Sequence, residues 1–313
     1  MEALFIGQTY IDVTFLADHM PQGDEKSVAS EYAVSFGGNA VTAAFCCAKL
    51  GVKPDLIATN ADDWLGNMFG DMAAKYDVRL HIRKVEKSSL SFIMPKDGKR
   101  AIVRCRDDHY LTSFPVLELT GCRALHIDGH QADAAMFYAK ACRKAGILTS
   151  LDGGGLRTNT HELLSFIDVA MVAERFCQQM DKTPDAMIDY LKSRGVKVGG
   201  VTQGERGVLW YDESGAVQRL AAPGMPGSRV RDTSGAGDVF HGGYVFSYLR
   251  HPEKSWRQHL QFASHAAAHK VQHLGNEAGL PTLRDVEAVA REFPQADAPR
   301  PARDSVAAMR ASR

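Results

Sequence analysis

Short apolar runs alternate along the chain with longer segments in which apolar residues recur at helical spacing. The apolar runs predict strands at residues 3–7, 55–59, 124–128, 148–152, 168–172, 200–202 and 208–211. The longer segments predict helices at residues 39–50, 64–76, 132–145 and 184–194. Three of these helices are followed by a glycine, the residue that helix C-caps favour: Gly51, Gly146 and Gly195. This alternation predicts an α/β fold with a Rossmann-like, doubly wound and mostly parallel sheet.

Two regions depart from this rhythm and predict a second, smaller sheet. Residues 24–36 and 89–106 read as extended segments, and residues 96–99 indicate a hairpin turn. With residues 10–16 they would form a sheet too small to bury both faces. We therefore expect a β-sheet lid, formed by about residues 10–36 and 88–106, that covers a cleft or pairs with a partner's copy. A peripheral ribbon without such a role is the alternative.

Composition narrows the possible partners. The 313 residues are 45% hydrophobic and 24% charged, and 37 basic residues balance 37 acidic ones. This balance gives no basic footprint for nucleic acid, and no apolar run reaches the length of a membrane span. We expect one domain over residues 1–294 and a flexible tail over residues 295–313.

The six cysteines show no CxxC pair and no regular framework spacing. They are interpreted as reduced, buried residues of a cytoplasmic protein. The chain begins Met-Glu-Ala-Leu-Phe-Ile-Gly, which has no basic segment or cleavage site and is interpreted as a first strand.

The stretch Asp232-Thr-Ser-Gly-Ala-Gly-Asp238 carries the clearest chemistry. Gly235 and Gly237, with Ala236 between them, let consecutive N–H groups point one way at the start of a helix. Such a helix N-terminus is a site for phosphate or an oxyanion. Asp238 places a carboxylate at this anion hole, where a general base could take a proton from the attacking group. The alternative is an aspartate that only stabilises the helix dipole.

This stretch resembles the C-terminal signature of the ribokinase-like (PfkB) carbohydrate kinases, and the resemblance extends over nearly the whole chain. The chain contains no P-loop, protein-kinase, dinucleotide or nucleophile-elbow motif, so an NAD dehydrogenase is disfavoured. The resemblance implies a sugar kinase that uses ATP and Mg²⁺, with activation by a monovalent cation left open. It also implies a lid that forms a homodimer.

A second glycine pair points to the sugar site. Gly37-Gly38-Asn39 opens a predicted helix and is similar to the family's first signature, in which the glycines and the asparagine hold the sugar. An N-cap role for Asn39 is an alternative that can coexist. Asp12 stands where the family places an aspartate that accepts from two sugar hydroxyls; a loop acid facing solvent is the alternative.

The resemblance also implies a nucleotide site. Thr202, Gly204 and Gly207 are similar to the family's Thr-x-Gly-x-x-Gly, which would bind a phosphate and let the backbone pass under the nucleotide. Ser264 would line the adenine pocket, or only pack a helix, and Gly275 would help to close that pocket.

Two further residues are candidates for sugar contacts. Arg104 ends a lid strand and could reach the sugar or an anionic substituent, with a solvated surface arginine as the alternative. His130 follows a predicted strand, in a segment that resembles ketohexokinases except that they carry arginine at this position.

The family's Asn-x-x-Glu motif is replaced here by Ala173-Glu-Arg-Phe176, and Glu174 could serve Mg²⁺ instead, directly or through water. Segments 87–94 and 238–242 look closest to sulfofructose kinases. Together with the ketohexokinase-like segment, they favour a ketose or ketose-derived substrate that is phosphorylated on a primary hydroxyl. A nucleoside kinase on the same fold, or a regulator that binds nucleotide or sugar without turnover, remains open.

Overall fold

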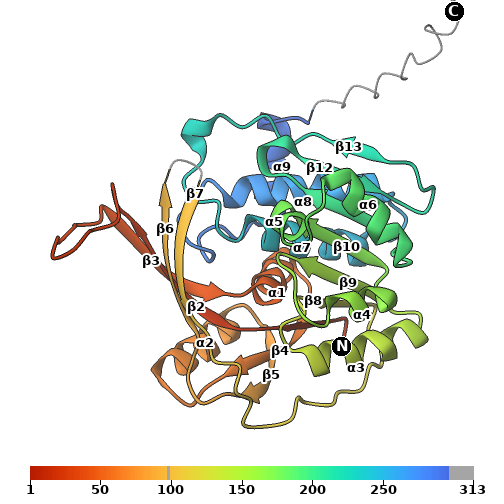
Figure 1. The fold of residues 1–313 in the computed structure, drawn as a ribbon, viewed down its shortest axis with the longest axis horizontal. Helices are drawn as coiled ribbons and strands as arrows, with labels where there is room; N and C mark the ends of the chain where they lie inside the picture. The colour runs from red at the N-terminus through yellow and green to blue at the C-terminus, as the bar shows by residue number, and fades with distance from the viewer. Residues whose placement is uncertain (97–98, 296–313) are drawn as a thin grey trace, which may run out of the picture.

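The computed structural model describes residues 1–96 and 99–295, with a large sheet at its centre (Figure 1). Within this range the sheet runs in the order β13-β12-β11-β10-β9-β8-β1-β4-β5, and only β12 and β13 are antiparallel to their neighbours. The strands are β1 (Ala3–Gly7), β4 (Pro54–Asn60), β5 (Arg79–Lys84), β8 (Ala124–Ile127), β9 (Leu148–Gly153), β10 (Val169–Ala173), β11 (Val198–Thr202), β12 (Val208–Tyr211) and β13 (Gln218–Leu220). The predicted Rossmann-like, mostly parallel sheet is confirmed.

Helices cover both faces of this sheet and create two cores. One core contains α1, α2, α7 and α8, and the other contains α3, α4, α5 and α6. Among the described residues, no helix is both long and apolar enough to cross a membrane. The helices are α1 (Asn39–Leu50), α2 (Trp64–Lys75), α3 (Ala132–Lys144), α4 (Thr160–Leu163), α5 (Glu174–Gln179), α6 (Pro184–Ser193), α7 (Ala236–Arg250), α8 (Trp256–Lys270) and α9 (Leu283–Glu292), with short 3₁₀ turns at Leu164–Phe166, Gly204–Arg206 and Gly227–Arg229.

The seven predicted strands and four predicted helices all form, with ends that differ by at most two residues. Two strands escaped prediction. β5 is the edge strand, and its sequence Arg-Leu-His-Ile-Arg-Lys lacks an apolar run because one side of it faces solvent. β13 has only three residues. The cysteines are free, and five are buried as expected, but the prediction is wrong for Cys105, which is exposed at the end of a lid strand.

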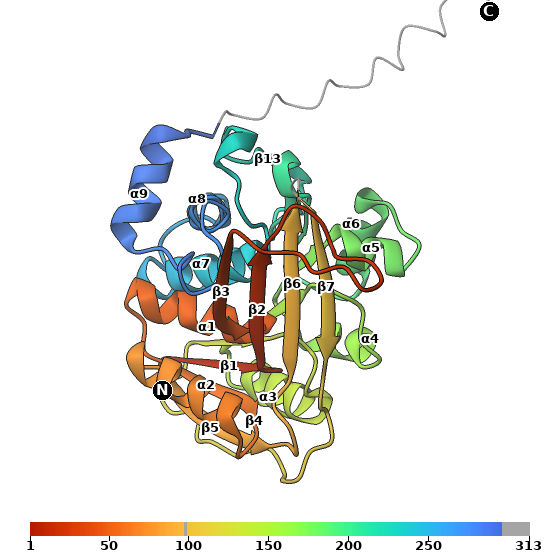
Figure 2. The same ribbon diagram turned by 90° about the vertical axis from the view of Figure 1, so that its left-hand side faces the viewer.

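The predicted smaller sheet forms a lid over the carboxyl ends of the parallel strands (Figure 2). Its order is β3-β2-β6-β7, in which β2 and β6 are parallel and the other pairs are antiparallel. Residues 24–30, predicted as extended, lie outside any strand, and the predicted turn falls partly on residues 97–98, outside the described residues. The lid strands are β2 (Tyr10–Leu16), β3 (Glu31–Gly37), β6 (Leu90–Lys96) and β7 (Lys99–Cys105).

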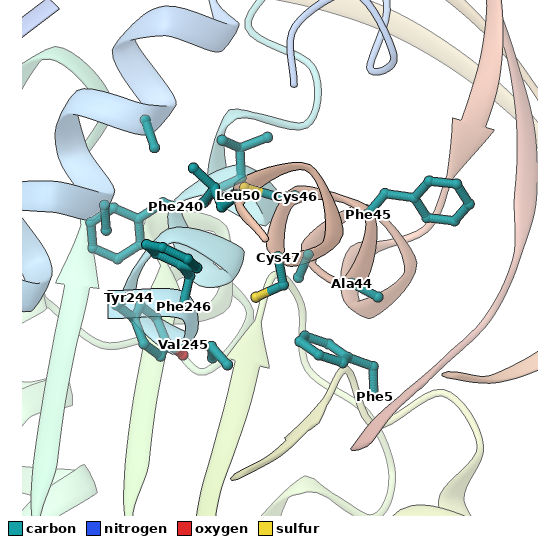
Figure 3. Packing of buried hydrophobic residues seen from close by; sticks show 14 of the residues in the cluster. Phe5, Ala44, Phe45, Cys46, Cys47, Leu50, Phe240, Tyr244, Val245 and Phe246 are labelled. Carbon is teal, nitrogen blue, oxygen red and sulfur yellow. Dashed lines mark hydrogen bonds between the residues drawn. The ribbon is translucent and has the colours of Figure 1, made fainter. Parts of the chain in front are cut away.

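Helix α7 is held tightly between α1 and α8 (Figure 3). Cys47 Sγ donates to the carbonyl of Gly242 at 3.1 Å. A Cβ on Gly242 would lie 2.6 Å from the carbonyl oxygen of Ala43, and one on Gly243 would lie 2.9 Å from Cα of Ala263. The two glycines therefore let α7 approach both neighbours closely, which fixes the start of this helix in space.

We predict opposite effects for two glycine-to-alanine substitutions in helices. Gly242→Ala should lower the free energy of unfolding by about 1–3 kcal/mol, because the new methyl group meets the α1 backbone. Gly70→Ala in α2, where a Cβ meets nothing within 4 Å, should raise it by about 0.5–1 kcal/mol. Urea unfolding of both variants measures this, and equal effects would contradict the packing argument.

Candidate active site

The turn before α7 has the geometry of an anion site. Gly235 is the N-cap of α7 with φ of 71°, a left-handed conformation that favours glycine. A Cβ there would also lie 2.2 Å from Oδ1 of Asn276. The N–H groups of Gly235, Gly237 and Asp238 make no hydrogen bond to the described part of the chain. These free donors, together with the helix dipole, suit a phosphate.

The carboxylate of Asp232 organises this turn from behind. It accepts from the backbone N–H of Ser234 at 2.8 Å and from the N–H of Gly275 at 3.0 Å. Nζ of Lys270 lies 3.0 Å from the same carboxylate, and neither side chain is exposed. Although burial alone would raise it, the Lys270 ammonium and these hydrogen bonds lower the pKa of Asp232. The buried ion pair thus joins the turn to the end of α8 and to residues 275–276.

Asn276 connects the same region to the lid. Its Nδ2 donates to Oδ2 of Asp12 at 3.1 Å and to the carbonyl of Phe36 at 2.9 Å. Its backbone N–H donates to Oγ of Ser35 at 3.2 Å. Gly275 lies against Ala33 of β3, where a Cβ would come within 2.7 Å. Its role in closing the adenine pocket stays a prediction.

Asp12 lies on the inner face of the lid, beside the glycine pair. A Cβ on Gly37 would be 2.3 Å from Oδ2 of Asp12, so only glycine leaves room for this carboxylate. Burial raises the pKa of Asp12, and its Oδ1 has no hydrogen-bond partner among the described residues. A buried acceptor of this kind needs a donor from a ligand. The solvent-facing alternative for Asp12 is therefore wrong.

Asn39 lies at the start of α1, at the carboxyl end of the main sheet. The N-cap of α1 is Gly38, with φ of 103°, so the N-cap alternative for Asn39 is wrong. The amide of Asn39 leaves no room for a side chain at Gly154, whose Cβ would lie 2.5 Å from Nδ2. The amide is thereby placed next to the loop that follows β9.

Asp238 lies in the first turn of α7 and is partly buried. Burial, followed by the negative charge of Asp152, raises the pKa of Asp238 to about 8. Asp12 adds to this rise, whereas Arg100 and Arg104 on the lid oppose it. The carboxyl group is therefore surrounded by charges from β9 and from the lid.

Asp152, at the end of β9, is held by groups that the sequence reasoning did not single out. Its Oδ1 accepts from the N–H of Gly154 at 2.7 Å, and its Oδ2 lies 3.1 Å from Nδ1 of His241. The same Nδ1 is 2.7 Å from the carbonyl of Gly237, and Nε2 is 3.1 Å from the carbonyl of Met171. Both ring nitrogens of His241 thus lie against oxygen acceptors, which places the ring between Asp152, Gly237 and Met171.

Two lid arginines lie along the cleft. Nη1 of Arg100 donates to the carbonyl of Thr233 at 3.2 Å, at the anion turn. Nε of Arg104 donates to Oγ of Ser91 at 3.2 Å, and its guanidinium carbon lies 4.7 Å from the ring centroid of Tyr10. Arg104 is exposed, as its surface alternative expects, and these contacts direct its guanidinium group toward Ser91 and Tyr10.

His130 follows β8 and is nearly enclosed, with 4% of its side chain exposed. Its Nδ1 lies 3.2 Å from Oδ1 of Asp128. Nη2 of Arg157 lies 2.9 Å from its Nε2. His130 therefore links Asp128 to Arg157.

The predicted nucleotide residues lie at the end of β11, at the 3₁₀ turn that follows it and on α8. Thr202 ends β11, and its Oγ1 donates to the carbonyl of Val172 at 3.4 Å. Gly204 has φ of 58° and open space around its missing side chain. Gly207 is needed for a different reason, because its Cβ would lie 2.0 Å from the carbonyl oxygen of Leu220. Ser264 donates within α8 to the carbonyl of Leu260 at 2.8 Å, as its packing alternative expects.

Glu174, the candidate metal ligand, begins α5 and forms an ion pair with Arg206. It also accepts from Nε2 of Gln203 at 3.2 Å. Within residues 1–96 and 99–295, no group of three or more His, Cys, Asp or Glu side chains could hold a metal ion. A Mg²⁺ ion here would therefore depend largely on ligands from a bound substrate, as is common for this ion.

This arrangement agrees with comparisons to known proteins. The profile of the pfkB family carbohydrate kinases matches residues 2–283. The chain belongs to this family. It is 22% identical to a ribokinase of Haemophilus influenzae, over 90% of this chain and 95% of that protein. The enzyme is therefore a ribokinase-like carbohydrate kinase.

Two solved structures share its fold. A putative ribokinase from Agrobacterium tumefaciens has a TM-score of 0.85 and 23% identity, over 93% of this chain and 97% of that one. Ribokinase of Arabidopsis thaliana, solved with ribose and ATP, has a TM-score of 0.76 and 22% identity, over 92% and 98%.

The buried ion pair behind the turn generates a stability prediction for this kinase. Lys270→Met should lower the free energy of unfolding by about 3–5 kcal/mol, because it leaves the Asp232 carboxylate buried and unpaired. The double variant Asp232→Asn/Lys270→Met should recover part of that loss. Urea unfolding of both variants and of the Asp232→Asn single variant gives the coupling energy, and additive losses would argue against a direct pair.

The raised pKa of Asp238 generates a pH prediction. The folded protein binds this proton more tightly than the unfolded chain, so the stability it contributes is complete below about pH 4 and is lost as pH rises through about 8. Asp238→Asn removes this loss and should stabilise the protein on the order of 2 kcal/mol at pH 8.5 but much less at pH 5. Urea unfolding at both pH values tests this, and a pH-independent difference would refute it.

Proposed function

We propose that this kinase transfers the γ-phosphoryl group of ATP to a primary hydroxyl of a sugar, with Asp238 as the general base. The observation that carries the proposal is the position of Asp238, whose carboxyl group adjoins the free N–H groups at the start of α7. The same carboxyl group is within electrostatic range of Asp12 and Arg104 on the lid. Base, anion hole and sugar-binding face therefore converge on one cleft.

The chemistry follows from these positions. In its ionised form Asp238 accepts the proton of the attacking hydroxyl, and its raised pKa makes it a stronger base. The free N–H groups of Gly235, Gly237 and Asp238 stabilise charge on the transferred phosphoryl group at little reorganisation cost. Mg²⁺, bound to the ATP phosphates, would neutralise their charge.

The sugar is bound between the lid and α1 in this proposal. Asp12 Oδ1, which has no partner among the described residues, accepts from sugar hydroxyls, and Asn39 supplies a donor and an acceptor. We favour a ketose or ketose-derived sugar, on the resemblance of segment 126–130 to ketohexokinases. Lid closure over the sugar would exclude water and so limit ATP hydrolysis.

The outer face of the lid is proposed to contact a second copy of the chain. Tyr32 and Val103 on this face are 67% and 64% exposed, and they lie on β3 and β7, the two edges of the lid. Apolar side chains left open on a small sheet favour burial against a partner.

Asp238→Asn should lower kcat about 10²- to 10⁴-fold, because the attacking hydroxyl loses its base, while the Kd for ATP changes little. Asp71→Asn, which removes an exposed carboxylate from α2, is the matched control and should retain full activity. ADP release with a panel of ketoses, aldoses and nucleosides measures turnover. A fully active Asp238→Asn variant would exclude Asp238 as the base.

The acceptor panel also separates the alternatives. Turnover of nucleosides but of no sugar would instead identify a nucleoside kinase. ATP binding by calorimetry without turnover of any acceptor would identify a regulator.

A further inference from the structure

The inner face of the lid changes character along its length. The strand register aligns Asp12 with Ser91 and Ser91 with Arg104, so these residues form one row across the lid. Successive residues on one face lie about 7 Å apart along a strand. In one direction from this row, β7 leads to Arg100, which donates to the carbonyl of Thr233 in the turn before α7. In the other direction, the chain leads to Tyr10 and Arg106, at the end of the cleft remote from that turn.

This remote end contains Arg157, which forms no ion pair with a carboxylate among the described residues. Arg157 follows β9, and its Nη2 donates to the lone pair of His130 Nε2. Its Nε is buried and has no hydrogen-bond partner among the described residues. Within the same residues, no carboxylate lies within 4.0 Å of Arg157. A neutral imidazole is a poor substitute for the anion that a guanidinium group normally binds.

Three guanidinium groups converge on one side chain there. Burial raises the pKa of the Tyr10 phenol, and three positive charges oppose that rise, those of Arg104, Arg106 and Arg157. Burial also lowers the pKa of Arg157; the charge of Asp128 opposes that effect, and the nearby Arg106 adds to it. Arg106 is paired with the exposed Asp108 at 2.8 Å, whereas Arg104 has no carboxylate partner within the described range.

The two carboxylates whose charges act on Arg157, Asp128 and Asp152, both have other partners. Asp128 is engaged by His130 and accepts from the N–H groups of Gln8 and Ala40 at 3.3 and 3.4 Å. Asp152 is engaged by His241 and Gly154. The partly buried guanidinium group of Arg157, which forms no ion pair among the described residues, costs free energy unless a ligand supplies an anion.

We propose that the acceptor sugar carries an anionic substituent, a phosphate, sulfonate or carboxylate, at the end remote from the hydroxyl that is phosphorylated. This inference rests on the proposed function. Arg157 and Arg104 bind the anion, and His130 orients Arg157 through its Nε2. Arg100, at the anion turn, serves the transferred phosphoryl group instead. The cleft thus has a carboxylate end for hydroxyl groups and a guanidinium end for an anion.

The test compares matched anionic and neutral sugars. Fructose 6-phosphate, 6-deoxy-6-sulfofructose and gluconate are compared with fructose and ribose, by ADP release and by calorimetric binding without ATP. The wild type should prefer an anionic sugar in kcat/KM. Arg157→Gln should reduce that preference about 10- to 100-fold, the loss expected for a charge-assisted contact. Arg157→Lys, which keeps the charge, should restore part of it.

Arg79→Gln removes the same charge from the edge strand β5, where Arg79 is 66% exposed, and should leave the preference unchanged. Thermal unfolding of each variant verifies its fold. Turnover of neutral sugars with no preference for anionic ones would overturn the inference and leave the kinase function intact. If no sugar is turned over, the proposed reaction fails, and the binding data test the inference separately. Binding of anionic sugars that depends on Arg157 would support the inference. Failure of anionic sugars to bind would overturn it.

Discussion

The site depends on one buried carboxylate. Asp232 holds the N–H of Ser234 on one side, the N–H of Gly275 on another and the ammonium of Lys270 behind them. The pair is fully enclosed, so neither charge can be solvated if the other is lost. Through these contacts a single side chain fixes the turn that begins α7, the end of α8 and the segment that reaches the lid.

The protein also carries several groups whose burial or lack of a partner lowers its stability. Asp238 is kept partly buried beside Asp152, and Asp12 has an oxygen with no partner among the described residues. Arg157 is likewise left without an anion in that range. The packing of α7 between α1 and α8 is rigid enough to hold these groups in place without ligand. Stability is thus concentrated behind the cleft, and unsatisfied charges and acceptors face into it.

The sequence predicted the features of the fold and the site that depend on a local pattern of residues. Apolar runs and capping glycines indicate the buried strands and their helices, and the glycine-rich motif indicates the anion-binding turn before α7. β5 was missed because this edge strand alternates charged or polar residues with apolar ones and therefore contains no apolar run. Asp152 could have been noticed, since it ends a predicted strand at the edge where the other candidates lie. Lys270 and Asn276 could not, because their partners lie 38 and 264 residues away along the chain and no local spacing indicates them.

The amide of Asn276 has two neighbours that belong to different halves of the cleft. Its nitrogen binds the carboxylate of Asp12, and its oxygen occupies the space that a side chain at position 235 would need. Any ligand that rearranges one end of this amide therefore displaces the other end as well. Occupancy of the two half-sites is consequently expected to show thermodynamic linkage, in which each ligand changes the affinity of the other by the same factor.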